Sequence, residues 1–536
     1  MLIGEVFAGP GQSLDAARPV TWTGLGPDQV FRRLTDEVWG RYVAIVRRGE
    51  SWSAYRDPSG ALECFGWRRD RLTVFASDIT PWLTASLPAD AALDNDRLAL
   101  MIAAPIAHYG DSAITGVTAL APGQSVVDGS PRMVWNPGRV SRARTRPDGA
   151  VERLLFDTVS TSVAALAGLP GVLGAEISGG LDSSIVAAAM PEPTRSGVAT
   201  WLNFYIDEPL GDERRYAGAV AETLGLVLTI AEKPEGVFDP RRQRAFGLTF
   251  RPPTSGVDQP YDHLIAHHAA NAGLDRLISG QGGDTVFLHA AAPGIARDLV
   301  LDRGLSGAFS PALIDLARWM RRSVWSVGRE AFKRRWGDDR LGVRPMAFAA
   351  DAVRALSPET SLHPWLDDLQ DVSPAKRFQI HSLGISQRLN TASERARHVD
   401  CLHPLLAQPV MEFSLRTSAI ALTRGGRDRA LARAAFSPSL PAAIVQRRSK
   451  GDGTAFFSRM VEGSLPALRP LLLEGELARR GLIDRGKLEA MLSPEHLVCE
   501  AGYPEFLDAA AIELWIRGWE DWRARRRRGA PAEMVG

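Results

Sequence analysis

The sequence predicts an α/β protein built from two parts, each with its own hydrophobic core. A chain of 536 residues is too long for one core. Residues 1 to about 135 alternate short apolar runs, such as 42–46, with turn signals such as Asp57-Pro58-Ser59-Gly60. From about residue 151, strand-like runs alternate with segments of helical periodicity, which is typical of a parallel sheet flanked by helices.

A segment rich in Arg, Pro and Gly separates the two parts. It begins at Asn136-Pro137-Gly138 and continues from Arg142 to Gly149, which favours a linker. We therefore predict an N-terminal domain over residues 1–140 and a second domain over residues 150–536. Beyond about residue 300 the periodicity is mostly helical, so we expect helices in the C-terminal part of the second domain.

The composition excludes several classes of function. The formal net charge of +1 is too small for a global field that attracts nucleic acid. No apolar run approaches the roughly 20 residues of a membrane helix, and the first residues lack a signal-peptide pattern. Three widely separated cysteines form neither a disulfide framework nor a metal cluster. We expect a cytoplasmic protein with neither nucleic acid nor membrane as its partner.

The most specific motif is a loop of glycine and serine between an apolar strand and an apolar helix. It spans Ser178–Ser184 and reads Ser-Gly-Gly-Leu-Asp-Ser-Ser. Gly179 and Gly180 let the backbone approach a phosphate closely, and the start of the following helix offers free N–H groups to an anion. The carboxylate of Asp182 needs a bridging Mg²⁺ to face phosphate. Hydroxyl donors come from Ser178, Ser183 and Ser184.

This string resembles the pyrophosphatase loop of ATP pyrophosphatases, most closely that of the asparagine synthetase group. Its spacing differs from the G-x-x-x-x-G-K-[ST] loop of other NTPases. The resemblance implies activation of a carboxylate by ATP as its acyl-adenylate, with AMP and pyrophosphate as products. Leu277–Phe287 resembles the family's Ser-Gly-x-Gly-x-Asp segment. By that resemblance Ser279 and Gly280 lie near the nucleotide, and Asp284 is the second Mg²⁺ ligand.

Two weaker matches complete the predicted nucleotide site. Thr200–Phe204 resembles the family's second strand, which implies that Asn203 stands where the backbone meets adenine; a plain core strand is the open alternative. Leu440–Gly451 resembles the family's Leu-Pro…Arg-x-x-Lys-Gly segment. The resemblance implies that Lys450 contacts the α-phosphate and pyrophosphate, where it stabilises charge that develops during catalysis.

The N-terminal part resembles the class II glutamine amidotransferase fold, an α+β sandwich of the N-terminal-nucleophile (Ntn) type. The resemblance rests on Trp39–Tyr42, Arg56–Gly60 and Phe75–Asp78. Glutamine-dependent members carry a cysteine nucleophile directly after the initiator methionine, whereas this sequence has Leu2. We expect a glutaminase-like domain without its nucleophile, kept as a scaffold or docking surface, and no hydrolysis of glutamine.

The catalytic pair of the family is also altered. Asparagine synthetases place Glu, and β-lactam synthetases place Tyr, where this sequence has Gln281. An amide is a poor proton acceptor, but Asp400 aligns with the downstream acid of the pair and remains a candidate base. An α-amine with a reference pKa of about 7.7–8.0 needs orientation more than a strong base. The predicted catalytic residues are therefore Gln281, Asp400 and Lys450.

The missing nucleophile, the Gln-Gly-Gly-Asp segment and the retained adenylation loop together resemble lasso-peptide cyclases. This resemblance implies that an Asp or Glu side chain of a precursor peptide is adenylated and then attacked by the peptide's N-terminal amine, closing a macrolactam. A leader peptidase and a leader-binding protein would be its partners. Open alternatives are a small-molecule amide or β-lactam synthetase, an ammonia-dependent asparagine synthetase, and a catalytically inactive nucleotide-binding scaffold.

Replacing Lys450 with alanine tests its predicted role in stabilising charge. We expect the rate of amide formation to fall by at least about 100-fold, which is the usual cost of removing one such group. The measurement is the initial rate of product formation at saturating ATP. An unchanged rate would assign Lys450 to the protein surface.

Overall fold

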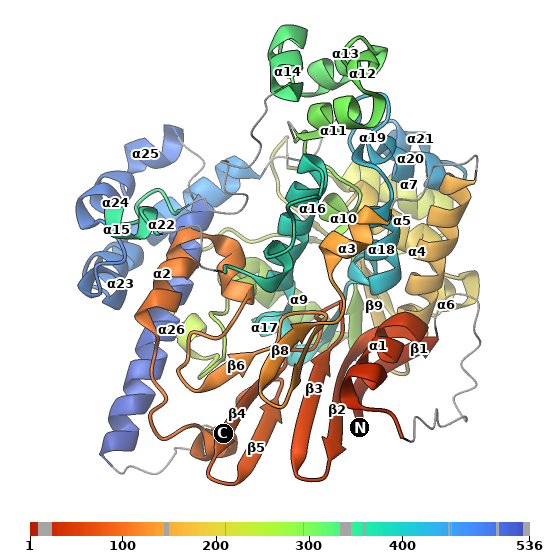
Figure 1. Cartoon of the computed structure of the whole chain (residues 1–536). Coiled ribbons are helices and arrows are strands. Elements are labelled where there is room, and N and C mark those ends of the chain that lie inside the picture. Colours follow the sequence, from red (N-terminus) through yellow and green to blue (C-terminus); the bar gives the residue numbers. More distant parts are fainter. Residues whose placement is uncertain are drawn as a thin grey trace.

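The computed structural model describes residues 1–8, 24–143, 150–209, 211–292, 294–332, 345–356, 361–448, 451, 453–499 and 503–528. These residues form a mixed α/β fold, with antiparallel strands in the N-terminal part, a parallel sheet in the middle and helices towards the C-terminus (Figure 1). The predicted parallel sheet and the predicted helical C-terminal part are confirmed. Lys450 lies outside the described residues.

The parallel sheet has the strand order β11-β10-β9-β12-β13. Its strands are β9 (Leu173–Glu176), β10 (Thr200–Tyr205), β11 (Leu228–Glu232), β12 (Arg276–Ile278) and β13 (Asp400–Leu402). Successive strands are added on one side of β9 and then, from β12, on its other side. In open parallel sheets, ligands bind beyond the carboxyl ends of the strands at such a reversal. The loops after β9 and β12 are the two segments that the sequence assigns to the nucleotide.

Helices cover both faces of this sheet. Consecutive side chains on a strand point to opposite faces, so Trp201 packs into the larger core on one side and Leu202 into a smaller core on the other. The larger core contains side chains of α4 (Val151–Ala167), α5 (Leu181–Ala189), α7 (Arg214–Leu224), α11 (Gly294–Arg303), α13 (Pro311–Trp319), α14 (Val324–Ala331), α16 (Pro374–Ile385), α18 (Gln408–Arg416), α19 (Ala419–Leu422), α20 (Ala430–Phe436) and α21 (Ala442–Val445). The smaller core is covered by α9 (Gln259–Asn271), beside which lies α17 (Glu394–His398).

The N-terminal part contains two antiparallel sheets. The larger sheet has the order β1-β2-β3-β7-β8 and the smaller one β5-β4-β6. The strands are β1 (Leu2–Ala8), β2 (Val38–Arg48), β3 (Ser51–Arg56), β4 (Phe65–Arg69), β5 (Leu72–Ala76), β6 (Val117–Ala119), β7 (Gln124–Val127) and β8 (Ser130–Met133). Helix α1 (Pro27–Glu37) places Phe31 and Leu34 against Tyr42 and Tyr55 on one face of the larger sheet. The likeness of this part to a glutaminase domain stays a prediction.

The segment expected to begin the linker is a helix instead. Residues Pro137–Arg142 form α3, whose first turn is capped by Asn136: its side-chain oxygen accepts a hydrogen bond of 2.9 Å from the backbone N–H of Arg139. Asn-Pro-Gly suggests a turn, but Asn is also a favoured helix cap and Pro is favoured in the first helical turn. Packing against α18 selects the helix.

The last helices pack beside the N-terminal part (Figure 1). They are α22 (Thr454–Leu473), α23 (Glu476–Arg479), α24 (Arg485–Met491), α25 (Pro494–Cys499) and α26 (Tyr503–Arg527). One hydrophobic core joins Leu468 and Trp515 from these helices to Trp67 and Met101 from the first 140 residues. The shorter helices are α2 (Asn95–Ala103), α6 (Glu192–Ser196), α8 (Pro240–Arg244), α10 (Gly283–Val286), α12 (Leu305–Ala308) and α15 (Asp351–Arg354). Across the described ranges, no helix is both long and apolar enough to cross a membrane.

Candidate active site

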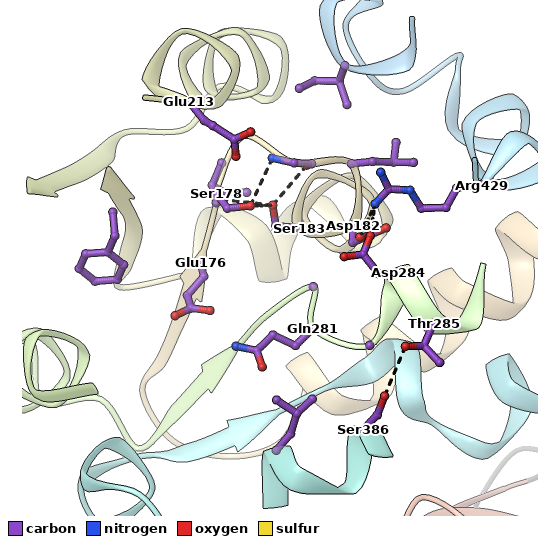
Figure 2. A pocket seen from close by; sticks show the side chains of 18 of the residues that line it. Glu176, Ser178, Asp182, Ser183, Glu213, Gln281, Asp284, Thr285, Ser386 and Arg429 are labelled. Carbon is purple, nitrogen blue, oxygen red and sulfur yellow. Dashed lines mark hydrogen bonds and ion pairs between the residues drawn. The ribbon is translucent and has the colours of Figure 1, made fainter. Parts of the chain in front are cut away.

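A cavity of about 510 Å³ lies at the carboxyl ends of β9, β10 and β12 (Figure 2). The cavity wall combines the loop after β9, the loop after β12, and residues of α16 and the turn that follows it. Among the predicted site residues, those that line it are Ser178, Gly180, Asp182, Ser183, Gly280, Gln281 and Asp284. The structure thus brings both glycine-rich segments to one cavity.

The loop after β9 is held in shape by its own hydroxyl groups. The backbone N–H of Gly180 donates to Ser178 Oγ at 3.2 Å, and Ser178 Oγ lies 3.1 Å from Ser183 Oγ. Ser184 Oγ donates to the carbonyl of Gly180 at 2.7 Å. Gly179 has φ of +83°, and a Cβ there would lie 2.7 Å from the carbonyl oxygen of Glu213, so glycine is required. The turn places the start of α5 at the cavity. The free N–H groups at the start of a helix favour binding of an anion.

The loop after β12 packs directly onto the first loop. A Cβ on Gly280 would lie 2.2 Å from the backbone nitrogen of Ser183, and one on Gly283 would lie 2.5 Å from Cγ of Asp182. Both contacts are far shorter than van der Waals distance, so only glycine allows this approach. The contact sets Asp284, at the start of α10, near Asp182 at the start of α5.

The two predicted metal ligands converge on one cation, Arg429. Its Nη1 lies 2.8 Å from Asp182 Oδ2 and 2.5 Å from Asp284 Oδ1. Figure 2 shows the guanidinium of Arg429 directed at the neighbouring carboxylates of Asp182 and Asp284. Two carboxylates gathered around one positive charge beside a phosphate loop fit the oxygen-ligand preference of Mg²⁺, which usually completes its shell with phosphate oxygens and water. Asp182 and Asp284 are therefore the residues that would hold Mg²⁺.

Arg429 is fixed by a network of its own. Asp428 accepts from Arg429 Nη2 at 2.8 Å and from Arg433 Nη2 at 2.9 Å. Burial acts to raise the pKa of Asp428, but the hydrogen bond from His289 and the charges of both arginines outweigh it and hold that pKa well below its ordinary value. Asp428 therefore stays ionised and anchors Arg429. Sequence reasoning missed this network; the signal was Asp428-Arg429 just before an apolar helical run.

The segment before Lys450 is tied to the phosphate loop by Arg447. Its Nη1 donates to the carbonyl of Gly179 at 3.1 Å, its Nη2 pairs with Glu213, and its guanidinium lies 3.7 Å from the ring centre of Tyr216. On the other side of Lys450, the backbone N–H of Gly451 donates to Glu213 Oε1 at 2.8 Å. The chain flanking Lys450 is thus anchored beside the loop, although Lys450 lies outside the described residues. Arg447 belongs to the segment Leu440–Gly451, but the sequence assigned it no role.

Besides Asp400, four predicted site residues are not among those that line this cavity. Asn203 is buried in β10 and its Nδ2 donates to the carbonyl of Ile177 at 2.6 Å, while its neighbours Leu202 and Phe204 line the cavity. Ser279 Oγ lies 3.1 Å from His403 Nδ1 in a small adjoining hollow. Ser184 donates to the Gly180 carbonyl within the loop, and Gly179 packs against the backbone of Glu213.

Asp400, a predicted catalytic residue, pairs with an arginine of the N-terminal part. Its carboxylate receives two hydrogen bonds from Arg41 of β2, at 2.9 and 2.7 Å, and it is not among the residues that line the cavity. This bidentate pair joins the parallel sheet to the antiparallel sheet of the N-terminal part. The placement could not be read from the sequence because the two residues are 359 positions apart.

The sequence model of the asparagine synthase family matches residues 154–517. The chain belongs to the asparagine synthase family. Members of this family are ATP-dependent carbon–nitrogen ligases that bind ATP, usually with Mg²⁺. The matched range of this asparagine synthase family protein begins in α4, ends in α26 and includes both glycine-rich loops. A comparison with curated proteins found no match.

Removing either carboxylate at the metal position tests the Mg²⁺ assignment. Asp182→Asn or Asp284→Asn should abolish ATP–pyrophosphate exchange, because a neutral amide holds Mg²⁺ poorly against the phosphates. Circular dichroism should remain that of the unchanged protein. The matched control is Asp351→Asn, at a carboxylate whose side chain is 88% exposed. Exchange at the normal rate in either cavity variant would refute the assignment.

Asp400→Ala separates a structural role from a catalytic one. Loss of the bidentate pair leaves the largely buried guanidinium of Arg41 without this carboxylate. We expect the free energy of unfolding to fall by about 1–3 kcal/mol, the range for hydrogen bonds to charged groups, while the exchange rate stays normal. Chemical denaturation measures the free energy of unfolding. Asp157→Ala, which removes an exposed pair with Arg153, should change stability very little. A stable but inactive Asp400→Ala protein would restore the catalytic reading.

Proposed function

We propose that the protein is a macrolactam synthetase that closes a ring in a precursor peptide. An Asp or Glu side chain of the peptide would be adenylated by ATP, and the peptide's N-terminal amine would then displace AMP. The family supports ATP-dependent amide-bond formation in general. The choice of a peptide substrate rests on the chemistry of the cavity wall.

The wall opposite the phosphate loop is uncharged apart from one arginine. It contains Ser382, Ile385, Ser386 and Leu389. The arginine, Arg388, already donates to the carbonyl of Thr254 at 2.9 Å. A free amino acid brings a charged α-amine and a charged α-carboxylate, and both would need partners of opposite charge. An Asp or Glu within a peptide has amides at those places, which an uncharged wall accommodates. This wall is the observation that carries the proposal.

The phosphate loop and two carboxylates of the cavity have defined tasks in the proposed reaction. The loop Ser178–Ser184 orients the phosphates at the start of α5. Asp182 and Asp284 would hold Mg²⁺, which supplies charge neutralisation for the departing pyrophosphate. The peptide carboxylate attacks the α-phosphorus, and the bond to pyrophosphate breaks. The amine nitrogen then bonds to the acyl carbon, the bond from that carbon to AMP breaks, and a proton leaves the nitrogen.

Mass spectrometry of a complete reaction tests this function. The protein is incubated with Mg·ATP, the candidate precursor peptide and the leader peptidase. The expected product is lighter than the cleaved core peptide by one molecule of water, and the nucleotide product is AMP, not ADP. The matched control is the same core peptide with an acetylated N-terminus, which lacks the nucleophile and should yield no ring.

Other outcomes would overturn the proposal in distinct ways. AMP formed only with aspartate and ammonia would make the protein an ammonia-dependent asparagine synthetase. AMP formed only with a small carboxylic acid would make it a small-molecule amide or β-lactam synthetase. No AMP with any of these substrates would make it a nucleotide-binding scaffold. We also expect the peptidase and the leader-binding protein to co-purify with it; recovery at background level would contradict that partnership.

A further inference from the structure

Glu176 is the last residue of β9 and lies two positions before the phosphate loop. Its side chain lines both the main cavity and the small hollow that adjoins it, as does that of Gln281. Figure 2 shows Glu176 and Gln281 pointing towards one another, away from the cluster of Asp182, Asp284 and Arg429. Oε1 of Glu176 is buried, and the described residues supply it with no hydrogen-bond partner. A buried carboxylate oxygen without a partner is costly unless a ligand brings a donor.

The other carboxylates of the cavity are already engaged. Asp182 and Asp284 pair with Arg429. Glu213 pairs with Arg447 and accepts from the backbone N–H of Gly451. Among the carboxylates that line the cavity in the described part of the chain, Glu176 differs in having a buried oxygen, Oε1, with no hydrogen-bond partner and no ion pair.

The other candidate bases near the site are unsuitable. Asp400 is held by Arg41 outside the cavity. His403 borders the hollow, but burial, followed by the charges of Arg395 and Arg41, lowers its pKa to about 3. A group with so low a pKa does not take a proton from an amine near neutral pH. Among the described residues that line the cavity, Glu176 is therefore the candidate base.

The groups that face Glu176 favour proton transfer. Burial raises the pKa of Glu176, opposed by the charge of Arg395 and by a hydrogen bond with Tyr261. Arg395 forms an ion pair with Asp262 at 2.5 Å, which offsets part of the positive charge that Arg395 presents to Glu176. The Cys401 thiol, also nearby, has its pKa raised to about 12 by burial and stays neutral. Of these groups, Glu176 is therefore the one that can accept a proton from a cationic amine.

We infer that Glu176 binds the amine nucleophile through Oε1 and accepts its proton. The inference rests on the proposed function and names the base for it. The ammonium of the substrate gives one proton to Oε1, which frees the nitrogen lone pair. The nitrogen bonds to the acyl carbon of the adenylate, the bond from that carbon to AMP breaks, and the second proton leaves with the phosphate or to solvent. Gln281, on the opposite side, is placed to orient the amine.

The test is Glu176→Gln, which keeps the shape and removes the base. Ring formation should fall by about 10²–10⁴-fold, the range for loss of a general base, while peptide-dependent ATP–pyrophosphate exchange stays within about twofold of normal. The wild-type rate of ring formation should rise with pH as Glu176 ionises, through a pKa above that of an ordinary glutamate. The variant should lose this rise. The matched control is Glu232→Gln, at the exposed end of β11.

Two results would overturn the inference. A higher KM for ATP, or loss of exchange in a folded Glu176→Gln protein, would assign the carboxylate to the nucleotide, for example to a ribose hydroxyl. Unchanged ring formation with an unchanged pH profile would remove Glu176 from the reaction. If Glu176→Gln fails to fold by circular dichroism, Glu176→Asp carries the same comparison, with a displaced but intact carboxylate. Failure of the proposed function itself is distinguishable, because the wild-type protein would then form no ring.

Discussion

The contact between two glycine-rich loops is the constraint on which the rest of the site depends. Gly280 and Gly283 approach Asp182 and Ser183 so closely that no side chain fits between them. Each loop follows a central strand of the parallel sheet, and β9 and β12 are hydrogen-bonded neighbours. The sheet register therefore fixes where the two loops meet. The glycine-rich turn after β9 and the carboxylates of Asp182 and Asp284 are brought together by this contact.

Charge organises the cavity around this contact. Arg429 holds the two carboxylates of the proposed metal position, and Asp428 holds Arg429. Arg447 ties the chain that precedes Ser449 to the loop. The phosphate end is thus strongly charged and internally paired. The opposite wall, with Ile385 and Leu389, is mostly uncharged. In the proposed reaction, this difference in charge separates the phosphates of the nucleotide from the groups to be joined.

The N-terminal part is coupled to the family domain by specific contacts. Arg41 donates two hydrogen bonds to Asp400, at the edge of the parallel sheet. Trp515 of the last helix is buried in a core that it shares with Trp67 of the N-terminal part. Arg251, within the family domain, pairs with Glu63 and donates to the carbonyl of His108 at 2.6 Å. Such contacts fix the N-terminal part against the family domain, whereas loosely tethered domains move relative to one another.

The sequence by itself determined the local chemistry of this protein. The string Ser178–Ser184 and the Gly-Gly-Asp of the second segment specify turns that only glycine can form, so the loops and the parallel sheet were predictable. The tertiary structure alone decided which distant side chains meet. It paired Asp400 with Arg41, placed Arg429 between Asp182 and Asp284, and left Glu176 facing the cavity. Side-chain pairing across hundreds of residues depends on packing between elements, and no local pattern of residues encodes it.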